Sequence, residues 1–333
     1  MVANSQATPA PPSFSYSFVP VGNAGNANNG TTGLGGVSYN YSIGKYDVTL
    51  TQYAAFLTAV ASSDPNGLYN TQMAADLTVA GINRTGSSGS YIYTVVGDGQ
   101  RPITYVSWFD AARLANWMQN GQPSGLGEVA GSTETGAYTL NGATSGVITK
   151  NSNATVWIPT ESEWYKAAYY DPTLNGGAGG YWQFATQSNT VPGNNAQNAG
   201  LANQANYNNS SYSVTQSSTF DPTQNYLTDV GLFANSSSFY KTFDQNGDVY
   251  QWTDAVIGSL RGERGGSWQS NVVPLWTVTA SDSGMDPGVN GEGPLLGIRL
   301  ASIPEPTATV SLALAGLLLF VRRKRNPANG ISS

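Results

Sequence analysis

Cysteine and histidine are both absent from the 333 residues of this chain. Without cysteine there is no disulfide, no thiolate nucleophile and no sulfur ligand for a metal. Without histidine, the commonest general base and the commonest transition-metal ligand are also missing. Ser-His-Asp and Cys-His catalytic devices are therefore excluded. The groups that remain are carboxylates, amides, tyrosines, lysines and arginines, which suit hard cations, sugars or carboxylate acid–base catalysis.

Charge is also scarce. Lys, Arg, Asp and Glu make up 10% of the chain, with a formal net charge of −6, whereas an average soluble domain has roughly 25% charged residues. No basic stripe runs through the body of the chain, so we expect no nucleic-acid partner. Glycine, asparagine, serine and threonine supply the polarity instead, which predicts a loop-rich surface of neutral hydrogen-bonding groups.

The C-terminus carries the most specific local pattern. Pro304, Glu305 and Pro306 precede an apolar run at 308–321, which ends at a basic cluster. The cluster comprises Arg322, Arg323, Lys324 and Arg325. The run is shorter than the ~20 residues that a spanning helix needs, and the basic cluster would hold its end on the cytoplasmic side. A short membrane anchor is one interpretation, but the order of the three parts resembles the PEP-CTERM sorting signal of Gram-negative bacteria.

This resemblance implies that the chain is exported and that residues 303–333 form a sorting tail recognised by exosortase-type machinery. The apolar helix would anchor the protein in the membrane at first, and the final location would be the cell envelope or the extracellular space. Export also needs a signal peptide, yet residues 1–14 have no positive n-region and no apolar h-region. We therefore expect a flexible lead there, with the true start upstream or a signal already removed.

The body of the chain, residues 15–302, shows no internal repeat and no linker, and is expected to form a single domain. Three predicted helices begin with a hydroxyl residue followed three positions later by an acceptor, the spacing of a capping box. These pairs are Thr49 and Gln52, Ser107 and Asp110, and Thr160 and Glu163. Short strands are predicted within 90–96 and 155–158. The pattern predicts a compact, loop-rich α+β domain.

Six segments resemble, in order, the signature segments of one family. They are YDVTLTQYAAF at 46–56, RPITYVSWFDA at 101–111, WIPTESEW at 157–164, GDVYQW at 247–252, RGGSW at 264–268 and GIR at 297–299. The family is the formylglycine-generating enzyme, or sulfatase-modifying factor, superfamily. The resemblance spans about 18–302 and implies a fold related to C-type lectins with little regular secondary structure.

Catalysis in this family depends on residues that the chain lacks. Members that make formylglycine bind copper with two cysteines just after the RGGS segment, and these positions fall near Ser270 and Leu275. Relatives that form sulfoxides hold iron with histidines. Because Cu(I) prefers sulfur ligands, we expect no copper, iron or zinc, and a non-catalytic binding or structural module at the cell envelope or matrix.

An enzyme with carboxylate-based chemistry on the same fold is the alternative. It would need two carboxylates that face one cleft and have separated pKa values. The late-chain candidates are Asp254, Asp282, Asp286 and Glu292. Glu161 and Glu163 also resemble an acid–base pair, but their place in the first turn of a helix favours capping.

Structural calcium is a further implication of the resemblance. One set of candidate ligands comprises Asp244, Gly247, Val249 and Gln251, and a second comprises Asn206, Tyr207 and Asp229. Gln251 replaces the family's glutamate, and a neutral ligand should weaken the site. The alternative is an ordinary Asp/Asn/Gly turn held by its own side chains.

The many aromatic and amide side chains are compatible with a glycan as the ligand. Four tryptophans at segment positions could form a sugar platform, although core positions are favoured. They are Trp108, Trp164, Trp252 and Trp268. A surface rich in asparagine, glutamine, serine, threonine and tyrosine would suit exopolysaccharide or another glycan, an expectation that rests on analogy of fold.

Overall fold

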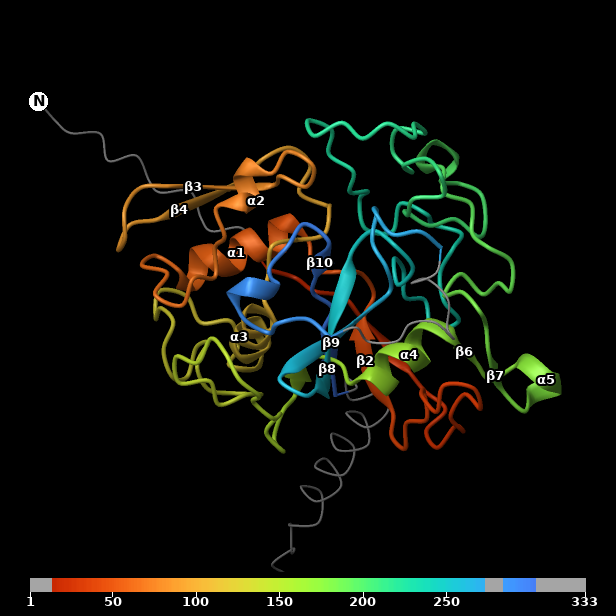
Figure 1. Ribbon diagram of the computed structural model, residues 1–333. Helices are drawn as coiled ribbons and strands as arrows, with labels where there is room; N and C mark the ends of the chain where they lie inside the picture. Colours follow the sequence, from red (N-terminus) through yellow and green to blue (C-terminus); the bar gives the residue numbers. More distant parts are fainter. Residues whose placement is uncertain (1–13, 273–283, 304–333) are drawn as a thin grey trace, which may run out of the picture.

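The computed structural model describes residues 14–272 and 284–303 (Figure 1). The predicted sorting tail at 304–333, the lead at 1–13, Leu275 and Asp282 lie outside these residues. Within the two ranges, none of the helices has both the length and the hydrophobicity that crossing a membrane demands. Helices and strands alternate with long irregular segments, which confirms the predicted compact α+β class.

The helices are α1 (Leu50–Val60), α2 (Gln72–Ala75), α3 (Trp108–Gln119), α4 (Glu161–Tyr169) and α5 (Leu174–Gly177), with 3-10 turns η1 (Ala196–Asn198) and η3 (Val289–Gly291). Three of them, α1, α3 and α4, begin where the sequence predicts a helix, and the short α2 and α5 were not predicted. All three capping boxes are formed: each hydroxyl accepts from the backbone N–H three residues on, and each acceptor side chain receives the cap's own N–H. In α3, for example, Ser107 N–H donates to Asp110 Oδ2 over 2.8 Å. Each box satisfies amides that a helix start leaves unpaired.

The strands are short. They are β1 (Phe18–Val21), β2 (Tyr41–Gly44), β3 (Ile82–Thr85), β4 (Ile92–Val95), β5 (Val156–Trp157), β6 (Tyr170–Asp171), β7 (Gly180–Tyr181), β8 (Tyr250–Ile257), β9 (Leu260–Arg264), β10 (Leu296–Gly297) and β11 (Ala301–Ser302). β4 and β5 lie within the two ranges predicted for strands. One sheet has the order β1-β2-β11-β5, a second has β10-β8-β9, and β3-β4 and β6-β7 form separate pairs.

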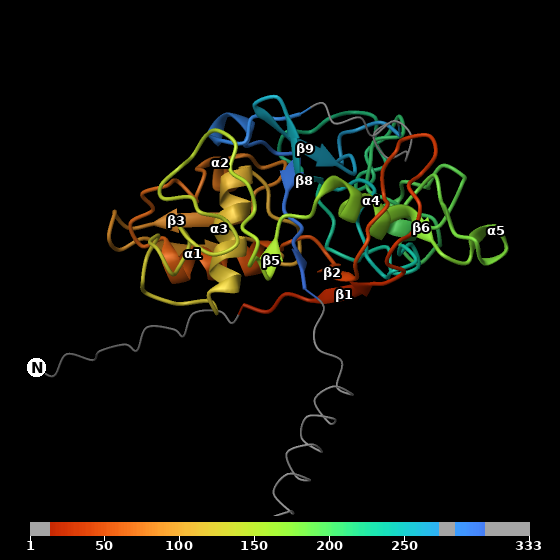
Figure 2. The ribbon, with the colours of Figure 1, turned by 90° about the horizontal axis from the view of Figure 1, so that it is seen from below.

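The order of the first sheet joins the two ends of the domain. β11 pairs antiparallel with β2 on one side and with β5 on the other, so that Ala301 lies opposite both Ile43 and Trp157. β1 and β2 lie beside this late strand in Figure 2. Phe14, which the sequence places in the flexible lead, packs edge-on against Trp117 of α3 with ring centroids 5.0 Å apart. Phe14 therefore packs against the domain.

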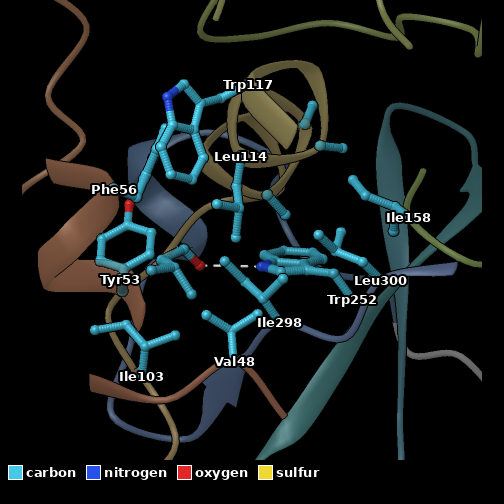
Figure 3. Close-up of a cluster of buried hydrophobic side chains, with 14 of the residues drawn as sticks. Val48, Tyr53, Phe56, Ile103, Leu114, Trp117, Ile158, Trp252, Ile298 and Leu300 are labelled. Atoms are coloured by element: carbon cyan, nitrogen blue, oxygen red, sulfur yellow. Dashed lines mark hydrogen bonds between the residues drawn. The ribbon is translucent and has the colours of Figure 1, made fainter. Parts of the chain in front are cut away.

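The main core lies between α1, α3 and the central strands (Figure 3). Trp252 of β8 points into it and donates its indole N–H to the backbone oxygen of Val106 over 3.0 Å. All four tryptophans named above are at most 2% exposed, which confirms the prediction of core positions over a surface platform. Burying one large apolar side chain contributes about 1.5–3 kcal/mol, so these motif residues stabilise the scaffold.

Candidate functional site

Ser270 lies near one of the two positions to which the family resemblance assigns a copper-binding cysteine. Its hydroxyl accepts a hydrogen bond from Ser267 N–H (3.1 Å), lies 3.0 Å from the Ser267 hydroxyl and donates to the phenol oxygen of Tyr250 (3.2 Å). Burial raises the pKa of Tyr250, so this phenol stays protonated at neutral pH. The neutral hydroxyl groups of Ser267, Ser270 and Tyr250 therefore lie together at this place. A soft metal would need sulfur ligands instead.

Sequence reasoning did not identify Ser267 and Tyr250 as partners of Ser270. Ser267 is fully buried, and Tyr250 is the first residue of β8. Both belong to signature segments, RGGSW and GDVYQW, so their membership in those segments was the available signal. Their contact depends on the fold, because β8 and the loop after β9 must first meet.

Gln251 is the centre of a buried hydrogen-bond network. Its Oε1 atom accepts from Trp164 Nε1 (2.6 Å) and from Arg299 Nε (2.8 Å), and its Nε2 atom donates to the Asp244 carbonyl oxygen (2.9 Å). The side chain is fully buried. The network ties together three signature segments that lie far apart in the chain. The same contacts occupy the Gln251 oxygen that the calcium hypothesis assigned to the ion.

The acidic side chains of the 244–251 segment also bond to the protein. Asp248 accepts from Asn206 Nδ2 (2.8 Å), Thr228 N–H (3.2 Å) and Thr228 Oγ1 (3.0 Å). Burial raises its pKa well above the usual range. Asp244 Oδ2 accepts from Gly231 N–H (2.6 Å), and burial raises the pKa of Asp244 to about 6. These contacts are those of a turn stabilised by its own side chains and neighbours.

The second set of candidate calcium ligands contacts the first through one backbone bridge. Asn206 and Gly247 form a parallel backbone bridge, and Asn206 Oδ1 is a buried oxygen with no hydrogen-bond donor among the described residues. Asp229 is partly buried, and burial followed by the nearby charge of Asp98 raises its pKa. Tyr207 uses its hydroxyl to bond the Pro192 carbonyl.

These side chains give calcium few free ligands. In the part of the chain that the structure describes, no three acidic, His or Cys residues form a group that could hold a metal ion. Because Ca²⁺ takes 6–8 oxygen ligands, the hydrogen bonds at Gln251 and Asp244 leave fewer oxygens for the ion. Among the candidate ligands, Asn206 Oδ1 is a buried oxygen without a donor in the described residues, and calcium binding stays a prediction.

The two helix-start carboxylates have structural partners. Glu163 accepts from Thr160 N–H (2.7 Å), from Tyr39 Oη (2.6 Å) and from Trp157 Nε1 (3.0 Å). Glu161 forms an ion pair with Arg264. Each carboxylate is held by different donors, so the pair is better explained by capping and packing than by acid–base catalysis.

The late carboxylates named for the enzyme alternative mostly pair with their surroundings. Asp254 forms an ion pair with Arg261 at 2.8 Å, and Asp286 accepts from Gly288 N–H at 2.9 Å. Glu292 accepts from Asn70 Nδ2 at 2.6 Å, and burial followed by the charge of Asp110 raises its pKa to about 8. The sequence did not indicate the proximity of Asp110 and Glu292, because it arises where the start of α3 bonds to Pro287.

Comparison with known proteins gives a family and a fold. Residues 21–302 match the family model described as "Sulfatase-modifying factor enzyme 1-like domain". No curated protein sequence matches the chain. The crystal structure of CarF is similar over 88% of this chain and 100% of its own, with 19% identity and a TM-score of 0.51. At that identity the likeness shows the fold alone.

Two further solved structures resemble the chain more distantly. Variable protein 1 of Treponema denticola covers 89% of this chain and 98% of its own, with 19% identity and a TM-score of 0.47. PvdO from Pseudomonas aeruginosa covers 82% and 83%, with 13% identity and a TM-score of 0.39.

Proposed function

The chain belongs to the sulfatase-modifying factor enzyme 1-like domain family, and from that premise we propose that it is a non-catalytic member, a binding or structural module at the cell envelope. The observation that carries the proposal is the state of Ser270. Its hydroxyl is bonded to Ser267 and Tyr250 on a scaffold whose signature segments are kept. A scaffold that retains its architecture without the metal ligands favours recognition over redox chemistry.

The chemistry of the missing residues supports this proposal. Oxidation of a substrate cysteine on copper requires thiolates, and the whole chain contains none. Oxygen and nitrogen ligands do not replace them, because Cu(I) selects soft sulfur donors. Iron held by imidazole is excluded by composition in the same way.

The location rests on the sequence of the tail. Residues 304–325 contain the Pro-Glu-Pro motif, the apolar run and the basic cluster in that order. Exosortase-type machinery would bind this tail, and a transient membrane anchor would precede delivery to the envelope or matrix. The neutral, amide-rich surface would then face polysaccharide, and a glycan is the ligand class that we propose.

A copper assay tests the non-catalytic role. The full chain is loaded with Cu(I) and incubated with a cysteine-containing sulfatase peptide under oxygen, beside a catalytic family member. We expect formylglycine only from the catalytic member. Copper-dependent turnover by this chain would overturn the proposal, whereas envelope localisation that persists after deletion of 304–325 would contradict only the sorting role of the tail.

An enzyme with carboxylate chemistry is the second candidate, favoured by the pair Asp110 and Glu292. Burial raises the pKa of both carboxyls, and the charge of Asp110 adds to the shift at Glu292, as happens when two carboxyls share a site. Against it, Asp110 caps α3 through Ser107 N–H. Hydrolysis of a glycoside or ester panel that Glu292→Gln abolishes without loss of stability would establish this candidate.

A further inference from the structure

A polar groove lies between the N-terminal loop 27–30 and the hairpin formed by β6 and β7. Its volume is ≈ 300 Å³, and Tyr170, Tyr181 and the backbone of 178–180 complete its lining. β6, β7 and α5 lie together at one end of the molecule (Figure 1). The volume is at the lower end of the range of small-molecule sites, about 300–1,000 Å³.

The walls of the groove are fixed by contacts within the protein. Tyr181 donates its hydroxyl to the Ala27 carbonyl (2.8 Å) and accepts from Asn26 Nδ2 (2.9 Å). The Asn28 side-chain oxygen accepts from Gly36 N–H (2.6 Å). These bonds tie the loop to the hairpin, in which Tyr170 lies opposite Tyr181. A ligand would therefore meet a site that is already ordered and would pay little conformational entropy.

The two tyrosines supply an apolar wall. Their ring centroids are 5.2 Å apart with planes inclined at 59°, and Tyr181 also packs on Tyr165 at 5.5 Å. Gly179 has φ +81°, and a Cβ there would collide with the Tyr170 hydroxyl. The backbone thus approaches the Tyr170 phenol closely, which fixes the floor of the groove.

The polar part of the lining is neutral. Every side chain that lines the groove within the described residues is uncharged. The side-chain amide nitrogens of Asn28 and Asn29 donate no hydrogen bond within that same part of the chain, since each side chain bonds there through its oxygen, to Gly36 N–H and Thr31 N–H. Amide groups and glycine backbone offer both donors and acceptors to hydroxyls. The lining side chains themselves would offer a charged ligand no counter-charge.

We infer that this groove is a binding site for a neutral glycan. A sugar ring presents an apolar face, which the two tyrosines would cover, and a rim of hydroxyls, which Asn28, Asn29 and the backbone would bond. The inference rests on the proposed function, and it names the surface and the ligand class through which a non-catalytic module would act.

Gly30 offers a way to block the groove without disturbing its walls. A Cβ at Gly30 meets nothing within 4 Å, and its φ lies in the ordinary range. Because Gly30 lines the groove, Gly30→Phe places a bulky ring at its wall, whereas Gly30→Ala adds a single methyl group. Gly200 has the same freedom and does not line the groove, so Gly200→Phe is the matched control for added bulk.

Titration calorimetry of the full chain with maltohexaose and cellohexaose tests the site, with an alginate oligomer as the anionic comparison. We expect a neutral oligosaccharide to bind, Gly30→Phe to weaken it by at least about tenfold, and Gly30→Ala and Gly200→Phe to bind as the parent does. Circular dichroism confirms that each variant is folded.

The other outcomes separate the site from the function. Binding that Gly30→Phe leaves unchanged overturns the groove while glycan recognition by the module stands. Binding of alginate alone overturns the neutral ligand. Binding of none of the three probes overturns both the groove as a glycan site and glycan as the ligand of the module, and leaves the non-catalytic assignment to the copper assay.

Discussion

Asp47 and Arg299 form an ion pair from which solvent is fully excluded, with Arg299 Nη2 3.3 Å from Asp47 Oδ2. The first residue lies in the opening signature segment and the second in the closing one, so the pair joins the two ends of the domain. The guanidinium also donates to the carbonyls of Gly44 and Phe243 (2.6 Å each) and to Gln251 Oε1 (2.8 Å). Arg299 thus serves as an internal cation at the junction of several loops.

Removal of this cation should be costly. Arg299→Met is expected to lower the free energy of unfolding by about 3–5 kcal/mol, the range for breaking a buried ion pair, because it leaves Asp47 unpaired and removes the donor to the carbonyls of Gly44 and Phe243. Asp47→Asn should cost less, because burial raises the pKa of Asp47 to about 8 in spite of the charge of Arg299, so the desolvated carboxylate contributes little net stability. Urea titration of both single variants and the double variant measures the coupling. Equal losses for the two single changes would contradict this account.

The capping box of α4 should contribute measurably to the free energy of unfolding. Thr160 accepts from Glu163 N–H and donates its own N–H to Glu163 Oε2. Thr160→Ala is expected to destabilise the domain by about 1 kcal/mol, and Thr160→Ser should retain most of the stability because its hydroxyl can accept the same bond. Thermal unfolding compares the two variants, and equal effects would show that the hydroxyl does not act as a cap.

Stability should fall as pH rises from about 5 to 8. Burial raises the pKa of Glu128 to about 7 and, with the charge of Asp110, that of Glu292 to about 8, both from an ordinary value of 4.5. The folded state therefore binds more protons than the unfolded state between about pH 4.5 and 8, and the stability gained from them is lost through that window. Urea midpoints at pH 5 and pH 8 measure the loss, which Glu292→Gln should reduce. A midpoint that rises with pH would contradict the assigned shifts.

The unfolding temperature should depend only weakly on calcium, and one substitution should strengthen that dependence. Gln251 is neutral and its oxygen is engaged by Trp164 and Arg299, so chelation by EGTA is expected to change the unfolding temperature little. Gln251→Glu restores an anionic oxygen, and any binding to the native state would then raise that temperature with calcium concentration. A large calcium effect on the parent protein would show that ligands other than Gln251 hold the ion.

Introducing two cysteines should allow the chain to bind copper. The double variant Ser270→Cys, Leu275→Cys is expected to bind Cu(I), because it restores soft ligands at the two family positions. Competition with a Cu(I) chelator measures the affinity, and Ser270→Cys alone is the control. Copper binding by the unaltered chain at comparable strength would contradict the role given to the missing cysteines.

Local features of the structure could be predicted from sequence because their causes are local. A hydroxyl and an acceptor three residues apart at Thr49, Ser107 and Thr160 satisfy the amides of a helix start whatever surrounds them, and all three helices begin there. The ordered signature segments likewise identified the family, and the lack of cysteine and histidine alone excluded whole classes of chemistry.

The tertiary structure decided what spacing along the chain could not. The three partners of Gln251, the closeness of Asp110 to Glu292 and the groove between loop 27–30 and Tyr181 all join segments far apart in sequence. Such contacts depend on how long loops close and on which buried polar groups must find partners. Composition by itself determined that this chain has neither cysteine nor histidine to bind a metal; only the fold decided that Ser270 lies beside two other hydroxyl groups and that Arg299 bonds to Gln251, because those contacts join distant segments.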